Sequence, residues 1–396
     1  MSTKQVKLPA TGMQALIFGA SGITGWAITN AAVTYPTPTT FNRIVGLTSR
    51  PLSLKDSGLP DDSRLQLYSG LDLSQSAQDI SKYLKSIENI HQITHVYFAA
   101  YVHRGWGEQD SEKRIKENVD FIVNSVAAVE QVCPNLQFWT FPTGGKWYGF
   151  EYGNKVERVT PLKENAPRIP SPYGDNIFYY PQVDKLAELA KGKAWKFADV
   201  RPDAIVGFVP NHNPMNIAEP LALYLSLWKS LRPHDPVPFP GTAESYTHGQ
   251  SNISSDQLGR FHIYVSLHPE KTAGEAFNIA DEDGPVSWEM VWSDIAAFFG
   301  LNGVGPIEQT VGLSGEKWVM AQKEMWGKWT EDNGLRSKVL DNTCWDFMTI
   351  VAGEYSTFDR HFDISKARSI GYLDSVDHAE GYRVAFRRMR AANIIP

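Results

Sequence analysis

Three glycines whose spacing suits phosphate binding stand close to the N-terminus. Residues 19–25 read GASGITG; they directly follow the apolar run 14–18 and precede a helical pattern over 26–31. Without side chains, the glycines let the chain turn tightly, let a pyrophosphate approach the helix N-terminus, and let the helix pack closely on the strand. A strand, a glycine turn and a helix in this order predict a dinucleotide-binding site.

The residues after the second and third expected strands bear on which dinucleotide binds. NAD-binding proteins hold the ribose hydroxyls with a carboxylate about 20 residues beyond the glycines, but this chain has Thr48, Ser49 and Arg50 there. A guanidinium and two hydroxyls suit the 2′-phosphate of NADP; a solvated surface cation is the alternative interpretation of Arg50. Asp72, followed by Leu73, is expected either to accept a hydrogen bond from the adenine or to cap a helix.

A tyrosine and lysine pair for proton transfer is not found at its usual spacing. Reductases with this fold generally place lysine four residues after tyrosine, so that the ammonium lowers the pKa of the phenol. None of the 16 tyrosines has such a lysine. The alternative lies in two separate segments, residues 143–149 (TGGKWYG) at the end of the fifth strand and residues 177–184 (IFYYPQVD) at a helix start.

These two segments resemble the T-G-x-K-x-Y-x-G and N-F-Y-Y-x-x-E-D motifs of the progesterone 5β-reductase/iridoid synthase family of atypical short-chain dehydrogenases/reductases. Residues 201–207 (RPDAIVG), 239–242 (FPGT) and 275–278 (EAFN) extend the resemblance, which spans about residues 19–299. It implies a catalytic lysine at Lys146 and a catalytic tyrosine at Tyr179. Phe150, Ile177 and Val183 depart from the family pattern but leave this pair intact.

The resemblance implies an NADPH-dependent reductase that transfers hydride to the conjugated C=C bond of a bulky apolar enone or enal. A phenol at Tyr179 would stabilise the enolate, and Lys146 would orient the nicotinamide ribose and favour the tyrosinate form. A carbonyl reductase or a redox-neutral epimerase on the same scaffold is one alternative. A non-enzymatic protein that senses NADP is another.

Two sets of residues are expected to bind the ligands. For NADPH we expect Gly19, Ser21, Gly22, Ile23, Thr24, Gly25, Thr48, Ser49, Arg50, Asp72, Leu73, Ala99, Ala100, Tyr101, Lys146, Tyr179 and Ile205. For the substrate we expect Tyr101, Trp106, Trp147 and Phe150 from the loops after the fourth and fifth strands, with Met215, Trp345, Phe347 and Met348 from the variable lobe. A pocket built this way would hold no cation except Lys146, and no metal is expected.

A doubly wound parallel sheet is needed to place these residues together. Near-continuous apolar runs alternate with helical segments, which indicates an α/β Rossmann-type fold covered on both faces. Strands are expected over residues 14–18, 43–47, 65–68, 94–100, 137–141, 195–201 and 275–280, and helices over 117–132, 183–191, 217–231, 256–267 and 288–299. We expect an NADP-binding domain over 1–206 and an interleaved, mainly helical substrate lobe over 207–396, with about 250–281 returning to the sheet.

Composition narrows the class of protein. The chain has 396 residues and a formal net charge of −6, so it lacks the basic field that a nucleic-acid backbone requires. Two cysteines leave no material for a disulfide framework or a zinc site. No apolar run approaches the ~18 residues of a membrane span. We therefore expect a cytoplasmic enzyme whose partner is a small hydrophobic carbonyl compound, and the family resemblance adds a homodimer.

Overall fold

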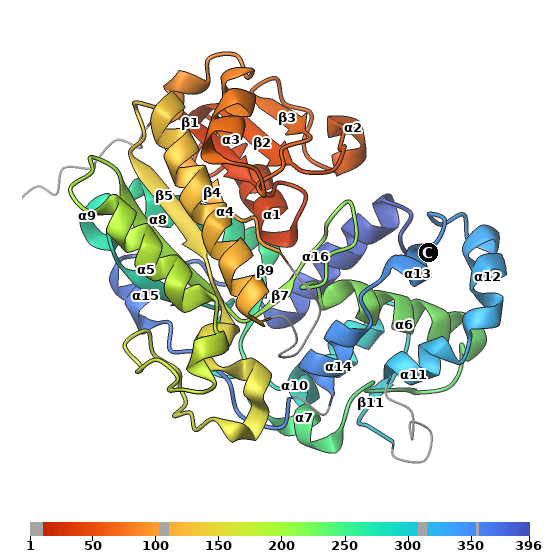
Figure 1. Ribbon diagram of the computed structural model, residues 1–396. Coiled ribbons are helices and arrows are strands. Elements are labelled where there is room, and N and C mark those ends of the chain that lie inside the picture. The colour runs from red at the N-terminus through yellow and green to blue at the C-terminus, as the bar shows by residue number, and fades with distance from the viewer. Residues whose placement is uncertain (1–10, 103–110, 308–314, 354–355) are drawn as a thin grey trace, which may run out of the picture.

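A seven-stranded parallel sheet forms the centre of the computed structural model, which describes residues 11–102, 111–307, 315–353 and 356–396 (Figure 1). The strand order is β10-β6-β5-β4-β1-β2-β3. The strands are β1 (Met13–Phe18), β2 (Phe41–Thr48), β3 (Leu65–Ser69), β4 (His95–Phe98), β5 (Phe138–Pro142), β6 (Lys196–Pro202) and β10 (Ala276–Ile279). This order reverses direction between β1 and β4, the position at which open α/β sheets bind their ligands.

Helices cover both faces of the sheet because successive strand residues point to opposite sides. Leu16 and Phe18 of β1 pack toward α3 (Ala77–Lys85), α4 (Ser111–Val132) and α5 (Tyr179–Ala190). Ile17 faces the other side, where α1 (Ile23–Ala32) and α8 (Ser255–Leu267) pack against each other. Both faces of the sheet are therefore shielded from water, as near-continuous apolar strands require.

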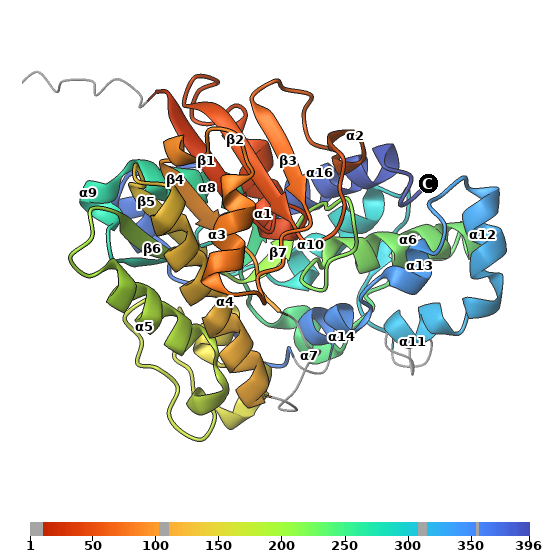
Figure 2. The ribbon, with the colours of Figure 1, turned by 45° about the horizontal axis from the view of Figure 1, so that its top comes forward.

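A mainly helical lobe lies to one side of the sheet (Figures 1 and 2). Its helices are α6 (Ala218–Leu231), α7 (Ala243–Thr247), α10 (Trp288–Ala297), α11 (Gly315–Met320), α12 (Trp326–Asp332), α13 (Val339–Asn342) and α14 (Asp346–Ala352). The lobe also contains two short pairs of parallel strands: β7 (Ala204–Val206) with β9 (Asn252–Ser254), and β8 (Val237–Pro238) with β11 (Gly303–Val304).

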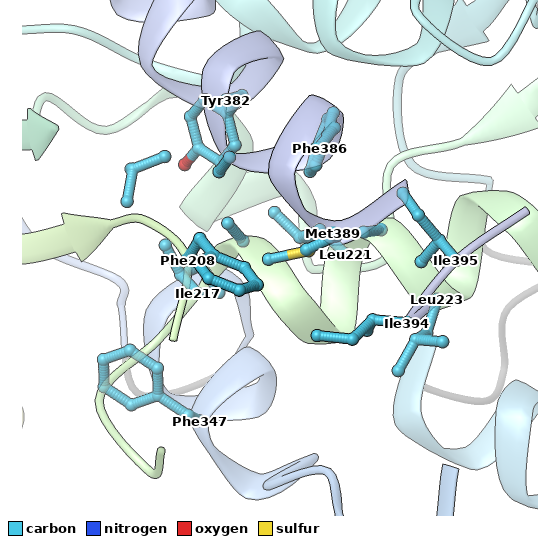
Figure 3. Packing of buried hydrophobic residues seen from close by; sticks show 14 of the residues in the cluster. Phe208, Ile217, Leu221, Leu223, Phe347, Tyr382, Phe386, Met389, Ile394 and Ile395 are labelled. Carbon is cyan, nitrogen blue, oxygen red and sulfur yellow. The ribbon is translucent and has the colours of Figure 1, made fainter. Parts of the chain in front are cut away.

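The C-terminal helix α16 (His378–Ala391) ties the lobe to the sheet domain. It contacts both α6 and β9. Figure 3 shows its side chains Tyr382, Phe386 and Met389 directed toward Leu221 of α6 and Phe208. Because these apolar side chains are almost fully buried, the lobe and the sheet domain share one hydrophobic core.

The expected α/β Rossmann-type fold is confirmed, including the strand at residues 275–280, which pairs with β6. The helix expected from residue 117 begins at Ser111, and the helix expected from residue 183 begins at Tyr179. Helices α11 to α16 were not predicted. Those from α11 to α15 have seven residues or fewer, too short for a clear helical period, whereas α16 is 14 residues long and was missed although its pattern is amphipathic. Among the described residues, no helix combines the length and apolarity that crossing a membrane demands.

Candidate active site

The glycine turn brings the start of α1 against the ends of two strands. Gly19 has a φ of +79°, and a Cβ atom there would lie 2.7 Å from the carbonyl oxygen of Ala99 after β4. A Cβ atom at Gly25 would lie 2.1 Å from the carbonyl oxygen of Gly19. Both positions exclude any side chain. The N-terminus of α1, with its unpaired N–H groups, therefore stands at the strand ends, where an anion is favoured.

A cavity of about 790 Å³ opens from this turn and reaches into the lobe. Its strand-end wall contains most of the residues that were expected there from the sequence. They are Gly22, Ile23, Thr24, Ala99, Ala100, Tyr101, Lys146, Phe150, Tyr179 and Ile205. On the lobe side, Met215 and Phe347 also line it. The fold thus gathers residues from the ends of four strands, β1, β4, β5 and β6, around one space of a size typical for small-molecule sites.

The residues after β2 and β3 lie outside that cavity. Ser49 and Arg50 are exposed at the end of β2. Thr48, in contrast, is buried, and its hydroxyl oxygen lies 2.7 Å from the Arg50 carbonyl oxygen and 3.0 Å from Ser69 Oγ. Thr48 therefore shapes the turn rather than offering a hydroxyl to a ligand, which corrects its expected role as a phosphate donor.

Asp72 and Leu73 also have local roles. The Asp72 carboxylate accepts hydrogen bonds from the backbone and hydroxyl of Ser74, at 2.9 and 2.7 Å, and from Gln75 at 2.8 Å, and these donors hold its pKa below the usual value. The helix that follows is capped by Ser76, so the expected capping role of Asp72 is wrong. Leu73 is buried among apolar residues.

Lys146 is held by a carboxylate that was not singled out from the sequence. Its Nζ lies 2.7 Å from Oε2 of Glu151, and both side chains are 15% exposed and line the cavity. Arg114 of α4 approaches the other oxygen of Glu151 at 3.9 Å. The positive charge of Lys146 is therefore balanced where it stands.

Tyr179 is the first residue of α5, and its hydroxyl lies beside the end of β5. A Cβ atom at Gly144 would lie 3.9 Å from Tyr179 Oη and 2.9 Å from the Pro202 carbonyl oxygen, so glycine leaves that hydroxyl uncrowded. Burial raises the pKa of Tyr179 above its usual value, and the nearby Tyr101, Glu151 and Asp199 add to the rise. These causes favour the protonated phenol, and the effect of Lys146 on the tyrosinate stays a prediction.

The neighbouring tyrosines are committed to the core. The Tyr180 hydroxyl donates to the Trp147 carbonyl at 2.7 Å and accepts from the Ile169 N–H at 2.9 Å. The Tyr148 hydroxyl donates to Asn278 at 2.7 Å. Tyr179 is consequently the tyrosine of this group that lines the cavity among the described residues.

A buried polar network fixes the lysine segment onto the sheet. The Asp199 carboxylate accepts from the Thr143 hydroxyl at 2.6 Å and from Arg201 Nε at 2.7 Å. The Arg201 guanidinium lies 3.7 Å over the ring of Trp147. Together with the Tyr148–Asn278 bond, these contacts assign positioning roles to the arginine and asparagine of the 201–207 and 275–278 motifs.

Three residues expected in the cavity wall lie in the core instead. Trp147 packs edge-on against Tyr180, with ring centroids 4.7 Å apart. The Trp345 indole donates to the Leu340 carbonyl at 2.9 Å, and Met348 is 1% exposed. In each case residues next to them in the chain line the cavity, and these three side chains do not. Trp106 lies outside the described residues.

The cavity also contains polar residues that were not expected. Arg360, Asp203 and Lys317 line it, so the expectation that Lys146 is its only cation is wrong. Arg360 and Lys317 sit in irregular or short helical segments, where no periodic pattern points to a site. Asp203 belongs to the RPDAIVG motif, but the motif does not show which way the Asp203 side chain faces.

Hydrogen bonds through Asn118 fix α5 relative to the chain that follows β4. Gln182 of α5 donates to the Asn118 carbonyl of α4 at 2.8 Å, and the Asn118 side chain bonds both backbone groups of Val102, accepting at 2.9 Å and donating at 3.2 Å. The chain that follows Tyr101 is thereby clamped beside Tyr179. Buried amides on two helices carry no sequence signal that distinguishes them from surface residues.

The sheet order, the glycine turn and the strand-end cavity define a Rossmann-fold protein of the short-chain dehydrogenase/reductase type. Residues 15–396 match the family described as "PRISE-like Rossmann-fold domain", and the chain belongs to that family. The expected family resemblance is confirmed.

Curated relatives cover nearly the whole chain. "Short chain dehydrogenase ausT" of Aspergillus calidoustus is 36% identical over 96% of this chain and 94% of its own length. "Short chain dehydrogenase sirQ" of Leptosphaeria maculans is 35% identical, with 96% and 97% covered. The "(S)-8-oxocitronellyl enol synthase" of Catharanthus roseus is more distant, at 23% identity with 96% and 92% covered.

Solved structures with the same fold are epimerases and related proteins. The UDP-N-acetylglucosamine 4-epimerase of Methanobrevibacter ruminantium has a TM-score of 0.63 at 12% identity, covering 97% of this chain and 99% of its own. Bordetella bronchiseptica WbmH, solved with NAD+, has a TM-score of 0.59 at 13% identity, with 96% and 98% covered. At such identities the likeness shows the fold alone.

Proposed function

We propose that this protein is an NADPH-dependent reductase that transfers hydride to the conjugated C=C bond of a bulky apolar enone or enal. The observation that carries the proposal is the meeting of Tyr179, Lys146 and the glycine turn in one cavity of about 790 Å³. Relatives named short chain dehydrogenases support an oxidoreductase, and one relative named an enol synthase supports chemistry at an enolate.

The residues present fit a dinucleotide. The cradle at Gly19 and Gly25, which a Cβ atom would fill, leaves the α1 N-terminus open to a pyrophosphate. Arg50 is exposed at the end of β2, where a carboxylate for an NAD ribose would otherwise stand, and this supports NADPH. The nicotinamide supplies the hydride when it is bound.

The state of Tyr179 supports reduction of an enone over an epimerase reaction that starts by oxidising an alcohol. Oxidation needs a phenolate to accept the hydroxyl proton, whereas here burial and Glu151 raise the pKa of the phenol. A protonated phenol donates a hydrogen bond to the substrate oxygen and stabilises the charge that develops there as the enolate forms. Lys146, which pairs with Glu151 in the cavity wall, would bind the nicotinamide ribose.

The proposal is tested by incubating the full chain with NADPH and the bicyclic enone 4a-methyl-4,4a,5,6,7,8-hexahydronaphthalen-2(3H)-one, and identifying the product by NMR. The saturated ketone is the expected product. An allylic alcohol assigns a carbonyl reductase instead. Turnover of a UDP-sugar with no reduction of the enone moves the protein to the epimerases, and tight NADPH binding with no turnover across an enone panel revives the sensing role.

A further inference from the structure

A buried arginine faces the cavity from the segment that precedes α15 (Ser365–Ser369). Arg360 is 4% exposed, yet it lines the cavity together with Asp203 and Phe150. Its guanidinium carbon lies 5.9 Å from the centre of the Phe150 ring. This residue comes from the far end of the chain and has no part in the hydride transfer described above.

The hydrogen-bonding capacity of Arg360 is only partly used. Nη2 donates to Gln250 Oε1 and, at 3.4 Å, to the Val351 carbonyl. Nε is buried without a hydrogen bond, and Nη1 makes none to the described residues. A buried guanidinium with idle N–H groups is costly unless another acceptor satisfies them.

The ion pair with Asp203 is long, but it determines the net charge of this part of the cavity. Arg360 Nε lies 3.4 Å from Asp203 Oδ2, and the two side chains are 5% and 6% exposed. Asp203 also accepts a long hydrogen bond from the Ser251 N–H at 3.4 Å. With one positive and one negative group, the pair carries no net charge, and a ligand carboxylate here would face the carboxylate of Asp203. A neutral oxygen acceptor avoids that repulsion and accepts from Nη1, whereas Nε is buried against Asp203.

The Asp203 end of the pair stands on the same wall as the proton donor. Asp203 follows Pro202, whose carbonyl packs against Gly144 beside the Tyr179 hydroxyl. Phe150 lies between the lysine segment and Arg360: its ring would touch a Cβ atom at Gly145 on one side and faces the guanidinium on the other. Tyr179, Phe150 and Arg360 line one cavity, so a molecule whose reacting carbonyl meets Tyr179 and which fills the space past Phe150 would reach Arg360.

We propose that Arg360, held by Asp203 and Gln250, binds a second, uncharged oxygen of the substrate, a ketone, lactone or ether oxygen, on the part of the molecule remote from the reacting enone. This inference rests on the proposed function and deepens it. The substrate class becomes a bulky enone or enal with a second oxygen function, and Arg360 becomes a specificity-determining residue.

A matched pair of bicyclic compounds tests the proposal. The enedione 8a-methyl-3,4,8,8a-tetrahydronaphthalene-1,6(2H,7H)-dione has the enone plus a distant ketone, and 4a-methyl-4,4a,5,6,7,8-hexahydronaphthalen-2(3H)-one lacks that ketone. We expect the wild type to show a higher kcat/KM for the enedione. Arg360→Met should lower the ratio of the two kcat/KM values at least about tenfold, which is the scale of one lost hydrogen bond to a charged group. The kcat/KM for the mono-ketone should change less than about threefold.

Controls separate specificity from folding. Arg360→Lys keeps the charge but not the planar fork, and should fall between wild type and Arg360→Met. Arg388→Lys removes a guanidinium that pairs with Asp256 outside this cavity, at 2.8 Å, and should leave the substrate preference unchanged. An equal loss for both compounds in Arg360→Met and Arg360→Lys overturns the proposal in favour of a structural role. Tighter binding of a carboxylate analogue than of the enedione overturns it as well.

Binding measured without turnover keeps this inference apart from the proposed function. Quenching of tryptophan fluorescence by each compound is recorded with NADP present, in wild type and in the Arg360 variants. If wild type reduces neither compound but binds the enedione in preference, and Arg360→Met abolishes that preference, the reductase proposal fails and the Arg360 site stands. Equal binding of both compounds by wild type refutes the Arg360 site, whatever the enzyme reduces.

Discussion

The two walls of the cavity are built in different ways. The strand-end wall consists of turns that directly follow β1, β4, β5 and β6, and its shape depends on backbone contacts so close that Gly19, Gly25 and Gly144 admit no side chain. The lobe wall is assembled from Met215, Phe347 and Arg360, which lie far apart in the chain and meet only through packing. A change in the first wall should therefore remove activity, whereas a change in the second should alter which molecule is used.

The strand-end wall should break most completely at Gly25. In Gly25→Ala the new Cβ atom meets the Gly19 carbonyl oxygen at 2.1 Å, so α1 must move away from the strand ends. We expect NADPH binding, measured by fluorescence titration, to be lost together with several degrees of melting temperature. Gly327→Ala is the matched control, because nothing lies within 4 Å of its Cβ position in α12; it should be neutral or slightly stabilising. Equal behaviour of the two variants would contradict this account of the turn.

The catalytic end of the same wall is tested by Tyr179→Phe. Loss of one donor to a developing oxyanion costs on the order of 10²–10³ in rate, so kcat should fall by that factor while NADPH affinity stays within about twofold. Tyr180→Phe should behave oppositely: it removes a hydroxyl bonded to Trp147 and Ile169, lowering stability by about 1–3 kcal/mol but sparing kcat. Full activity in Tyr179→Phe would remove this residue from the mechanism.

The end of β2, outside the cavity but on the same edge of the sheet, should decide between the two dinucleotides. Arg50→Glu places a carboxylate where a 2′-phosphate would bind, and the loss of a charged hydrogen bond is worth roughly 1.5–3 kcal/mol. We expect NADPH to bind about ten- to a hundredfold more weakly and NADH to be nearly unaffected, as measured by isothermal titration. Unchanged NADPH affinity would place the phosphate elsewhere.

A smaller effect is expected at Glu151, a positioning residue that acts through Lys146 and Tyr179. Removing its charge in Glu151→Gln leaves the Lys146 cation unbalanced and removes one cause of the raised pKa of Tyr179. Burial is the largest cause of that rise, so the phenol stays protonated over the assay range and the pH profile of kcat/KM should not move. The KM for NADPH should change instead, because Lys146 has lost the carboxylate that holds it in the cavity. An unchanged KM for NADPH would remove Glu151 from the positioning of Lys146.

Away from the cavity, the contact between the end of β10 and β9 should show itself in the pH dependence of stability. Burial raises the pKa of Asp281 to about 7, although Ser254 donates two hydrogen bonds of 2.8 Å to it. The folded protein thus holds this proton more tightly than the unfolded chain does. The stabilisation it gives is complete below about pH 4 and is lost as the pH rises through about 7.

Asp281→Asn should therefore make the urea unfolding free energy fall less steeply between about pH 4 and 7, each pKa unit being worth about 1.4 kcal/mol. Asp72→Asn is the contrasting variant. The pKa of Asp72 is lowered by Ser74 and Gln75, so its contribution is present above about pH 4 and lost as the pH falls. Parallel stability curves for wild type and Asp281→Asn would refute the assignment.

The predictions made from sequence succeeded and failed on both walls. Strand positions, the glycine turn and the placement of Lys146 and Tyr179 on the cavity followed from local patterns and family motifs. Trp147 was expected in the cavity wall because it follows the fifth strand, and Trp345 because of the family resemblance and its apolar character, yet both are buried in the core. Size and apolarity favour either position, and only the neighbours decide between them.

By itself, the sequence determined the doubly wound sheet and the place of the cofactor turn, because hydrophobic periodicity and glycine spacing act over a few residues. Only the tertiary structure decided the charges around the reacting groups. It pairs Lys146 with Glu151, keeps Tyr179 protonated, and brings Arg360 to Asp203 across 157 positions of the chain. Electrostatic environments depend on distances and burial between remote segments, and a linear pattern contains neither.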